Sequence, residues 1–108
     1  MDRFILRQAQ ELEAKLAKAQ EEMANATVEA SAGGGAIKIV INGQQKVQKV
    51  TLSPEVDAAD RELLEDLILT AINEAIAKSQ EMAQSRMNQV TAGLKLPGLP
   101  GMGRKGFR

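Results

Sequence analysis

The side chains of this sequence that could take part in chemistry are carboxylates, lysines and arginines. The 108 residues contain no Cys and no His, so a disulfide, a thiolate metal site, a Cys-His pair and a Ser-His-Asp triad are all excluded. The usual general base at neutral pH is missing for the same reason. Any site must therefore be built from the 14 acidic and 14 basic residues.

Two segments have the composition of a ligand site, and we interpret both as structural. Glu62, Glu65 and Asp66 carry the oxygen ligands that Mg²⁺ prefers, but acids in the first turns of a helix normally interact with the helix dipole. Gly33-Gly34-Gly35 has the composition of a phosphate cradle, yet no Gly-Lys-Ser/Thr follows it. The sequence therefore predicts no metal, no cofactor and no enzyme activity, and a carboxylate-only enzyme is the third alternative.

Charge is sorted along the chain, although the formal net charge is zero. Residues 31–54 carry three lysines and no acid, residues 55–81 carry eight acids against two basic residues, and residues 82–108 carry five basic residues and no acid. No aromatic side chains are interleaved with the basic ones, and no helix-turn-helix, zinc-finger or basic-zipper spacing is present. Any DNA contact must then rest on phosphates and shape. A solvated charged surface is the competing interpretation.

The spacing of apolar residues predicts the elements that position these charges. Residues 3–26 carry a seam with alternating steps of four and three, which is typical of a helix packed along another helix. The seam consists of Ile5, Ala9, Leu12, Leu16, Ala19, Met23 and Ala26. Residues 27–31, 36–41 and 46–52 are predicted strands. The triple glycine joins the first two, and Asn42-Gly43 predicts a tight hairpin because both turn positions need positive φ.

A second helix is predicted from about residue 60 to residue 90, capped by Asp57 or Asp60. Its apolar face is broad from Leu63 to Ile76, which predicts burial against the sheet and against another helix. Beyond Ala77 the apolar face thins, and we expect that half to project as an arm. The predicted fold class is α+β, with a long N-terminal helix, a three-stranded antiparallel meander and a long C-terminal helix. Residues 1–92 form one domain, and residues 93–108 form a flexible Gly/Pro-rich basic tail.

The amount of apolar surface predicts a homodimer. The seam and the broad face of the second helix exceed what one short meander covers, and small chains often bury further surface between copies. We expect that Asp at both Leu67 and Ile68 gives a monomer or an unfolded chain, because a buried unpaired charge is costly. The sequence has neither a membrane-spanning apolar run nor a signal-peptide core, which predicts a cytosolic protein.

The order of these segments resembles the YbaB/EbfC family of bacterial nucleoid-associated proteins. The resemblance is carried by residues 7–10, the triple glycine at 33–35, residues 38–43, residues 50–55, residues 63–68 and residues 94–98. It implies a tweezer-shaped homodimer that is cytoplasmic and nucleoid-associated, binds double-stranded DNA with little sequence preference, and has no enzyme activity or cofactor. Many members begin with a glycine- and lysine-rich leader where this chain has Met1-Asp2-Arg3-Phe4. We therefore expect weaker binding, or a shift of the contact to the C-terminal tail.

The predicted DNA-contacting residues are basic residues toward the two ends of the chain. They are Arg3, Arg7, Lys15, Lys18, Arg86, Lys95, Arg104, Lys105 and Arg108. The acidic residues within 55–66 are expected to face away from DNA, because they would repel phosphate. The alternative function is a dimeric protein-interaction scaffold that does not bind DNA directly.

Overall fold

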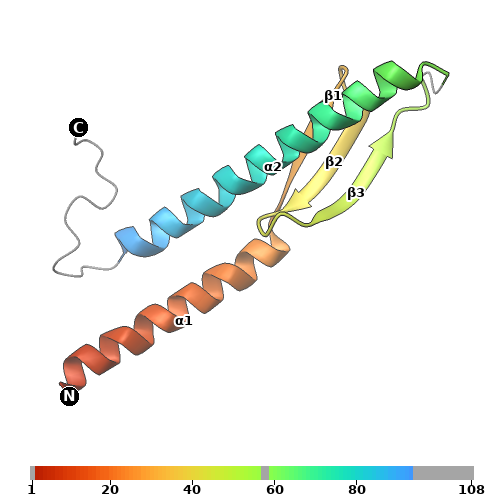
Figure 1. Cartoon of the computed structure of the whole chain (residues 1–108). Coiled ribbons are helices and arrows are strands. Elements are labelled where there is room, and N and C mark those ends of the chain that lie inside the picture. The colour runs from red at the N-terminus through yellow and green to blue at the C-terminus, as the bar shows by residue number, and fades with distance from the viewer. Residues whose placement is uncertain (1, 57–58, 94–108) are drawn as a thin grey trace, which may run out of the picture.

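The computed structural model describes residues 2–56 and 59–93. The elements follow the order α1 (Arg3–Asn25), β1 (Thr27–Ala32), β2 (Ile37–Asn42), β3 (Val47–Leu52) and α2 (Arg61–Ala92). The strands form one antiparallel sheet in the order β1-β2-β3, and α2 lies across one of its faces (Figure 1). The predicted α+β class and meander are confirmed. Of the predicted tail, only Gly93 lies within the described residues.

The core lies between α2 and the strands β1 and β2. Burial alternates along β2, with Ile37, Ile39 and Ile41 buried, as expected for a strand with one covered face. Ala71 and Ala75 of α2 are also buried in this cluster, and their small side chains let the helix approach the sheet closely. The partly buried residues packed around the cluster are Val28, Ala36, Leu64, Leu67 and Ile68. Leu67 and Ile68 thus pack beside the chain's own core while staying partly exposed, and the effect of Asp at these two positions stays a prediction.

Both helices begin at an aspartate whose side chain satisfies a free backbone N–H. Asp2 accepts a hydrogen bond from the Phe4 N–H at 2.9 Å, and Asp60 accepts one from the Leu63 N–H at 3.1 Å. These are N-cap interactions, each worth about 1 kcal/mol of helix stability. Of the two caps predicted for the second helix, Asp60 is confirmed, and Asp57 lies outside the described residues.

α1 and the second half of α2 extend together past the end of the sheet, and we call this pair of helices the arm. The N-terminus of α1 and the C-terminal end of α2 point the same way in Figure 1, so the two helices are antiparallel. Ala19 and Met23 of α1 lie beside Ala83 and Met87 of α2. The apolar seam of α1 is thus covered from within the chain at Ala19, which is buried, but Ile5 near its start is 56% exposed.

The connection between β2 and β3 differs from the tight hairpin predicted for Asn42-Gly43. Asn42 is the last residue of β2, and the residue with positive φ is Gln45, at 62°. The Asn42 side chain is used elsewhere: its Nδ2 donates to the Ala24 carbonyl at the end of α1, at 3.0 Å. Its Oδ1 accepts from the backbone N–H groups of Gln44 and Lys46, each at 2.9 Å. The turn is therefore shaped by its contact with α1, which local sequence does not reveal.

Gly43 is required for the close approach of α1 and not for an unusual φ. Its N–H donates to the carbonyls of Met23 and Ala26, at 2.8 and 3.1 Å. A Cβ at this position would lie 2.7 Å from Met23 Sδ and 3.0 Å from the Met23 carbonyl oxygen. The flexible thioether can move, but the backbone oxygen cannot do so without shifting α1.

Gly43→Ala should therefore lower the free energy of unfolding by about 1–3 kcal/mol, the usual cost of overpacking. Urea denaturation followed by circular dichroism measures this change. Gly34→Asn is the control, because a Cβ there meets nothing within 4 Å and Asn tolerates positive φ. An equal loss in the two variants would mean that the approach of α1 does not constrain position 43.

Candidate nucleic-acid interface

The basic residues fall into two groups: those whose side chains form a hydrogen bond or ion pair within the chain, and those whose side chains form neither. In the described part of the chain, two cationic side chains bind other residues of the chain: Lys78 through a hydrogen bond, and Arg86 through hydrogen bonds and an ion pair. The side chains without a hydrogen bond or ion pair in the same part are Arg3, Arg7, Lys15, Lys18, Lys38, Lys46, Lys49 and Arg61. These unpaired, exposed cations are the candidates for contact with an anionic ligand.

Four of the unpaired cations lie on α1, where all of them are exposed. Arg3 and Arg7 are one turn apart, and Lys18 follows Arg7 by eleven residues, or about three turns, so helical geometry places the three on one side of α1. Glu11 lies four residues after Arg7 and interrupts this row. α1 as a whole carries four basic and four acidic residues, so its net charge is zero. Its attraction for phosphate must come from one face and not from the helix as a whole.

Arg86 joins the two helices of the arm. Its Nε donates to Glu22 Oε1 at 2.7 Å, its Nη2 forms an ion pair with the same oxygen, and its Nη1 donates to Gln89 Oε1 at 3.3 Å. The Arg86 side chain is 29% exposed. The structure thus shows a brace between α1 and α2, and the remaining N–H groups of the guanidinium are still available to a ligand.

The remaining predicted contacts, Lys95, Arg104, Lys105 and Arg108, lie outside the described residues. The acidic residues expected to avoid DNA are clustered around the start of α2. That end of α2 is the one farthest from the arm (Figure 1). The lysines of the sheet, Lys38, Lys46 and Lys49, are not among the predicted contacts, although the sorting of charge in the sequence already marks them.

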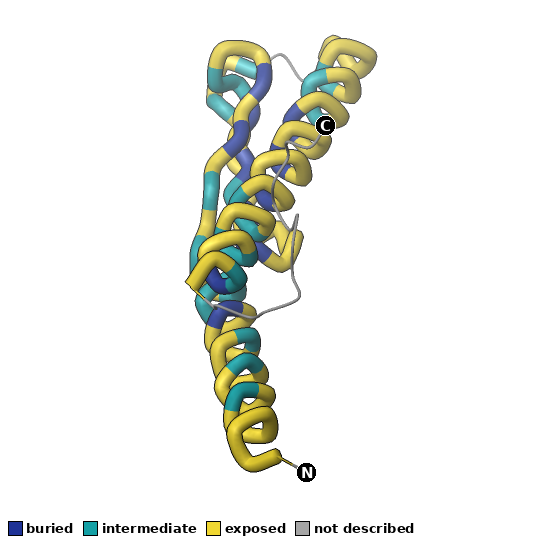
Figure 2. Tube along the Cα trace, turned by 90° about the vertical axis from the view of Figure 1, so that its left-hand side faces the viewer, coloured by how far each residue is buried: buried dark blue, intermediate teal, exposed yellow. Residues whose placement is uncertain are grey.

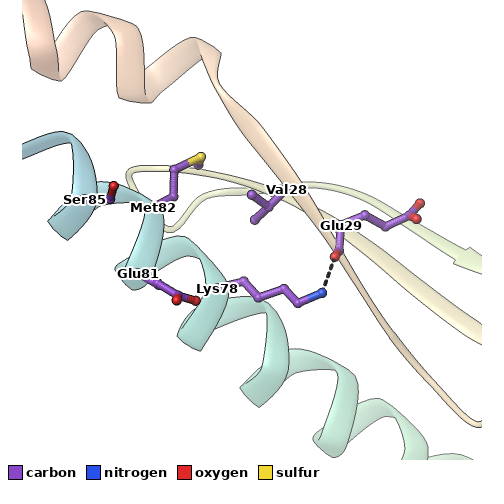
Figure 3. A pocket seen from close by; sticks show the side chains of 6 residues that line it. All are labelled: Val28, Glu29, Lys78, Glu81, Met82 and Ser85. Atoms are coloured by element: carbon purple, nitrogen blue, oxygen red, sulfur yellow. Dashed lines mark hydrogen bonds between the residues drawn. The ribbon is translucent and has the colours of Figure 1, made fainter.

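Two grooves on the described surface are lined by side chains that do not favour phosphate binding. The groove between α2 and β1, about 510 Å³, is shown in Figure 3 and is lined by Val28, Glu29, Lys78, Glu81, Met82 and Ser85. Its lysine already donates to the Glu29 carbonyl at 3.1 Å, and the Glu81 carboxylate lines the same groove, whereas the Glu29 carboxylate points away from α2. The second hollow, about 290 Å³, lies at the root of the arm next to Arg86 and two methionines.

Metal binding and membrane spanning find no support in the described residues. In residues 2–56 and 59–93, no group of three or more carboxylates is placed to hold a metal ion. Over the same ranges, neither helix has the length and apolarity needed to span a bilayer. Within this part of the chain, the features that stand out are the unpaired cations and the projecting arm.

Comparison with known proteins identifies the family. A "Nucleoid-associated protein" of Ruminiclostridium cellulolyticum is 48% identical over 99 residues, which cover 91% of this chain and 84% of the relative. One from Chloroflexus aurantiacus is 48% identical over 94 residues, covering 86% and 94%. The crystal structure of an uncharacterized Helicobacter pylori protein has the same fold, with a TM-score of 0.65 and 13% identity over 86% of this chain and 96% of that one. The model of the YbaB/EbfC DNA-binding family matches residues 1–94, and the chain therefore belongs to that family.

Proposed function

We propose that this protein is a nucleoid-associated protein of the cytoplasm that binds double-stranded DNA as a homodimer, with little sequence preference and through phosphate contacts. The observation that carries the proposal is the arm, on which four cations are exposed and have no partner in the chain. Phosphate contacts fix a protein on DNA without reading its sequence. The names of the relatives support association with the nucleoid.

The contact surface proposed on the arm contains Arg3, Arg7, Lys15 and Lys18. Arg86 borders this surface through the N–H groups that its ion pair leaves unused. Lys95, Arg104, Lys105 and Arg108 are proposed to add contacts from residues beyond α2. A dimer doubles this set of cations, and two linked contact surfaces also raise the effective affinity.

A strip of exposed apolar residues supports the dimer, and we call it the uncovered strip. Its members are Val47, Val50 and Leu52 on β3, and Leu69, Ile72 and Ile76 on α2. Val50 and Leu52 pair across the sheet with Ile39 and Ile37, so they lie on the same sheet face as the core. α2 packs on β1 and β2, and every residue of β3 is exposed.

Two members of the strip, Ile72 and Ile76, lie on the side of α2 that faces the connection between β2 and β3. Ser79 Oγ donates to the Asn42 carbonyl and accepts from Gln45 Nε2, so that side of α2 faces the connection between β2 and β3. Ile72 and Ile76 precede Ser79 at spacings of seven and three, which places them on the same side of the helix. Ile72 and Ile76 on α2 and the apolar residues of β3 are thus left exposed by the chain itself, and we propose that a second copy covers them through the same residues.

Salt dependence of binding tests the phosphate contacts. Fluorescence anisotropy with two duplexes of unrelated sequence should give equal affinities that fall as salt rises, with about 0.9 added to the negative log–log slope for each phosphate neutralised. Replacing Arg104, Lys105 and Arg108 with Gln should lower the slope and weaken both duplexes equally. Replacing the four arm cations should do the same.

The matched control is Arg61→Gln, which removes an unpaired cation next to acidic residues at the far end of α2. Its affinity and slope should equal those of the wild type. An unchanged slope in the tail variant would remove those three residues from the contact surface. If the intact protein binds neither duplex even at low salt, the scaffold alternative replaces DNA binding.

A further inference from the structure

The sheet has a second face that no described element covers. α2 packs against the face that carries Ile37, Ile39 and Ile41, and Figure 2 shows the strands as one layer with the helix on one side of it. Alternate residues of the strands point to the other side, among them Lys38 and Thr51, which are cross-strand partners. We call this surface the open face. The uncovered strip belongs to the opposite face, so a dimer formed through that strip leaves the open face accessible.

The sheet is also the part of the described chain with a net positive charge. Residues 27–52 contain three lysines and one glutamate, so 3 − 1 = +2. α1 carries four basic and four acidic residues, so 4 − 4 = 0. α2 carries three basic and five acidic residues, so 3 − 5 = −2. An anionic ligand that approaches the described structure therefore meets the most favourable average charge at the sheet and not at either helix.

The register of the sheet places two of the three lysines together on the open face. Lys49 pairs with Val40, and Lys38 pairs with Thr51. Lys38 and Lys49 are thus diagonal neighbours on one face, about 7–8 Å apart at the backbone. Lys46 lies at the end of the connection that leads into β3. All three are exposed, and none has a hydrogen-bond or ion-pair partner for its ammonium group.

The neighbours of these lysines favour a phosphate backbone over other anionic partners. Neither of the two grooves described above lies on the open face. Thr51 and Ser31, which both pair with Lys38, add hydroxyl groups that donate to phosphate oxygens. A lysine is a point charge on a flexible stem and needs no fixed geometry to reach a phosphate. Glu29 and Val40 lie in one row with Lys49 on this face, so one carboxylate accompanies Lys38 and Lys49 and the face keeps a net positive charge. An extended polyanion fits such an open surface.

We propose that the open face of the sheet, with Lys38, Lys46 and Lys49, is a second DNA-contact surface that is separate from the arm. This inference rests on the proposed DNA binding and adds the expectation that one dimer binds two duplex segments. One surface lies on the sheet and the other on the arm, which extends past the end of the sheet. A dimer can therefore hold two duplex segments at once and bridge them.

Bridging is measured by capturing a fluorescent duplex on beads that carry an unlabelled duplex. The wild type should bridge the two duplexes. Lys38→Gln, Lys46→Gln and Lys49→Gln together should reduce capture about tenfold and lower the negative salt slope by up to about 0.9 for each lost contact. The triple variant should still bind a single duplex through the arm. Its melting temperature should equal that of the wild type, because the three ammonium groups have no partners in the chain.

The matched control is the triple Lys→Arg variant, which keeps the three charges and should bridge as the wild type does. Capture and salt slope of the Gln variant equal to those of the wild type would overturn the sheet surface. A wild type that binds DNA without bridging would also overturn it, and would leave the proposed function intact. A wild type that binds no DNA would instead overturn the proposed function itself.

Discussion

Glutamate at both Ile72 and Ile76 should convert the proposed dimer into a folded monomer with the mass of one chain, 11.6 kDa. In a single chain these side chains are 38% and 37% exposed, so a carboxylate there stays in contact with water and Glu is a good helix former. In a dimer built on the uncovered strip, the same carboxylates would be buried without a partner. That burial costs several kcal/mol, which exceeds the free energy of association that a small interface can lose and still hold a dimer.

Sedimentation equilibrium at micromolar concentration distinguishes the two states, and far-UV circular dichroism shows whether the chain is folded. Thr70→Glu with Ala77→Glu is the matched control, because it adds the same charge to exposed positions on the side of α2 away from the sheet and the strip. This control should remain a dimer. Val50→Lys gives an independent test from the β3 side of the strip, and it should also give a folded monomer.

The monomer should bind duplex DNA at least about tenfold more weakly, because it loses the second set of phosphate contacts and the gain from bivalence. A wild type that is monomeric at micromolar concentration would contradict the dimer. A variant that remains dimeric would place the interface elsewhere. A dimeric wild type without affinity for DNA would agree with the scaffold alternative.

Local sequence patterns were enough to predict the elements. The heptad spacing of residues 3–26 predicts α1, which runs to Asn25, and the β-branched run at residues 36–41 predicts β2 at Ile37–Asn42. The triple glycine is a turn with positive φ at all three positions. These features depend on periodicity and backbone preference, which are properties of the chain alone.

Features set by contacts between distant segments could not be predicted in the same way. Asn42-Gly43 has the composition of a tight turn, but α1 packs against it and determines its shape. The broad face of α2 predicts burial on two sides, yet only the packing shows that Leu67 belongs to the core and Ile72 does not. Arg86 counts as a free cation in the sequence, whereas Glu22 pairs with it from 64 residues away.

The position of the sheet lysines is likewise a feature that could not be predicted from local sequence patterns. In the sequence, Lys38 and Lys49 are separated by the whole connection between β2 and β3, and only the register places them side by side on one face. Basic residues are more numerous toward the two ends of the chain, and the sequence therefore predicts the DNA contacts there. Among the helices and the sheet that the structure describes, only the residues of the sheet carry a net positive charge.

Asn42→Ala should lower the free energy of unfolding by about 2–4 kcal/mol, because three hydrogen bonds are lost at one buried position. The Asn42 side chain joins the end of α1 to the connection between β2 and β3, and the residue is 3% exposed. α1 would then be held by the hydrogen bonds of Gly43 and Gln44 to its last turns and by the Arg86–Glu22 ion pair with α2.

Gln44→Ala is the matched control for this junction, because Gln44 also donates from its side-chain amide to an α1 carbonyl, that of Gln20, but is exposed. Its cost should stay below about 1 kcal/mol, since water replaces the lost hydrogen bond. Urea denaturation measures both variants, and hydrogen exchange of the α1 amides shows whether the arm has loosened. Because DNA binding by two arms depends on their fixed direction, Asn42→Ala should also weaken duplex binding under conditions where the protein is still folded. Equal stability and equal exchange in the two variants would show that the buried amide does not hold the arm.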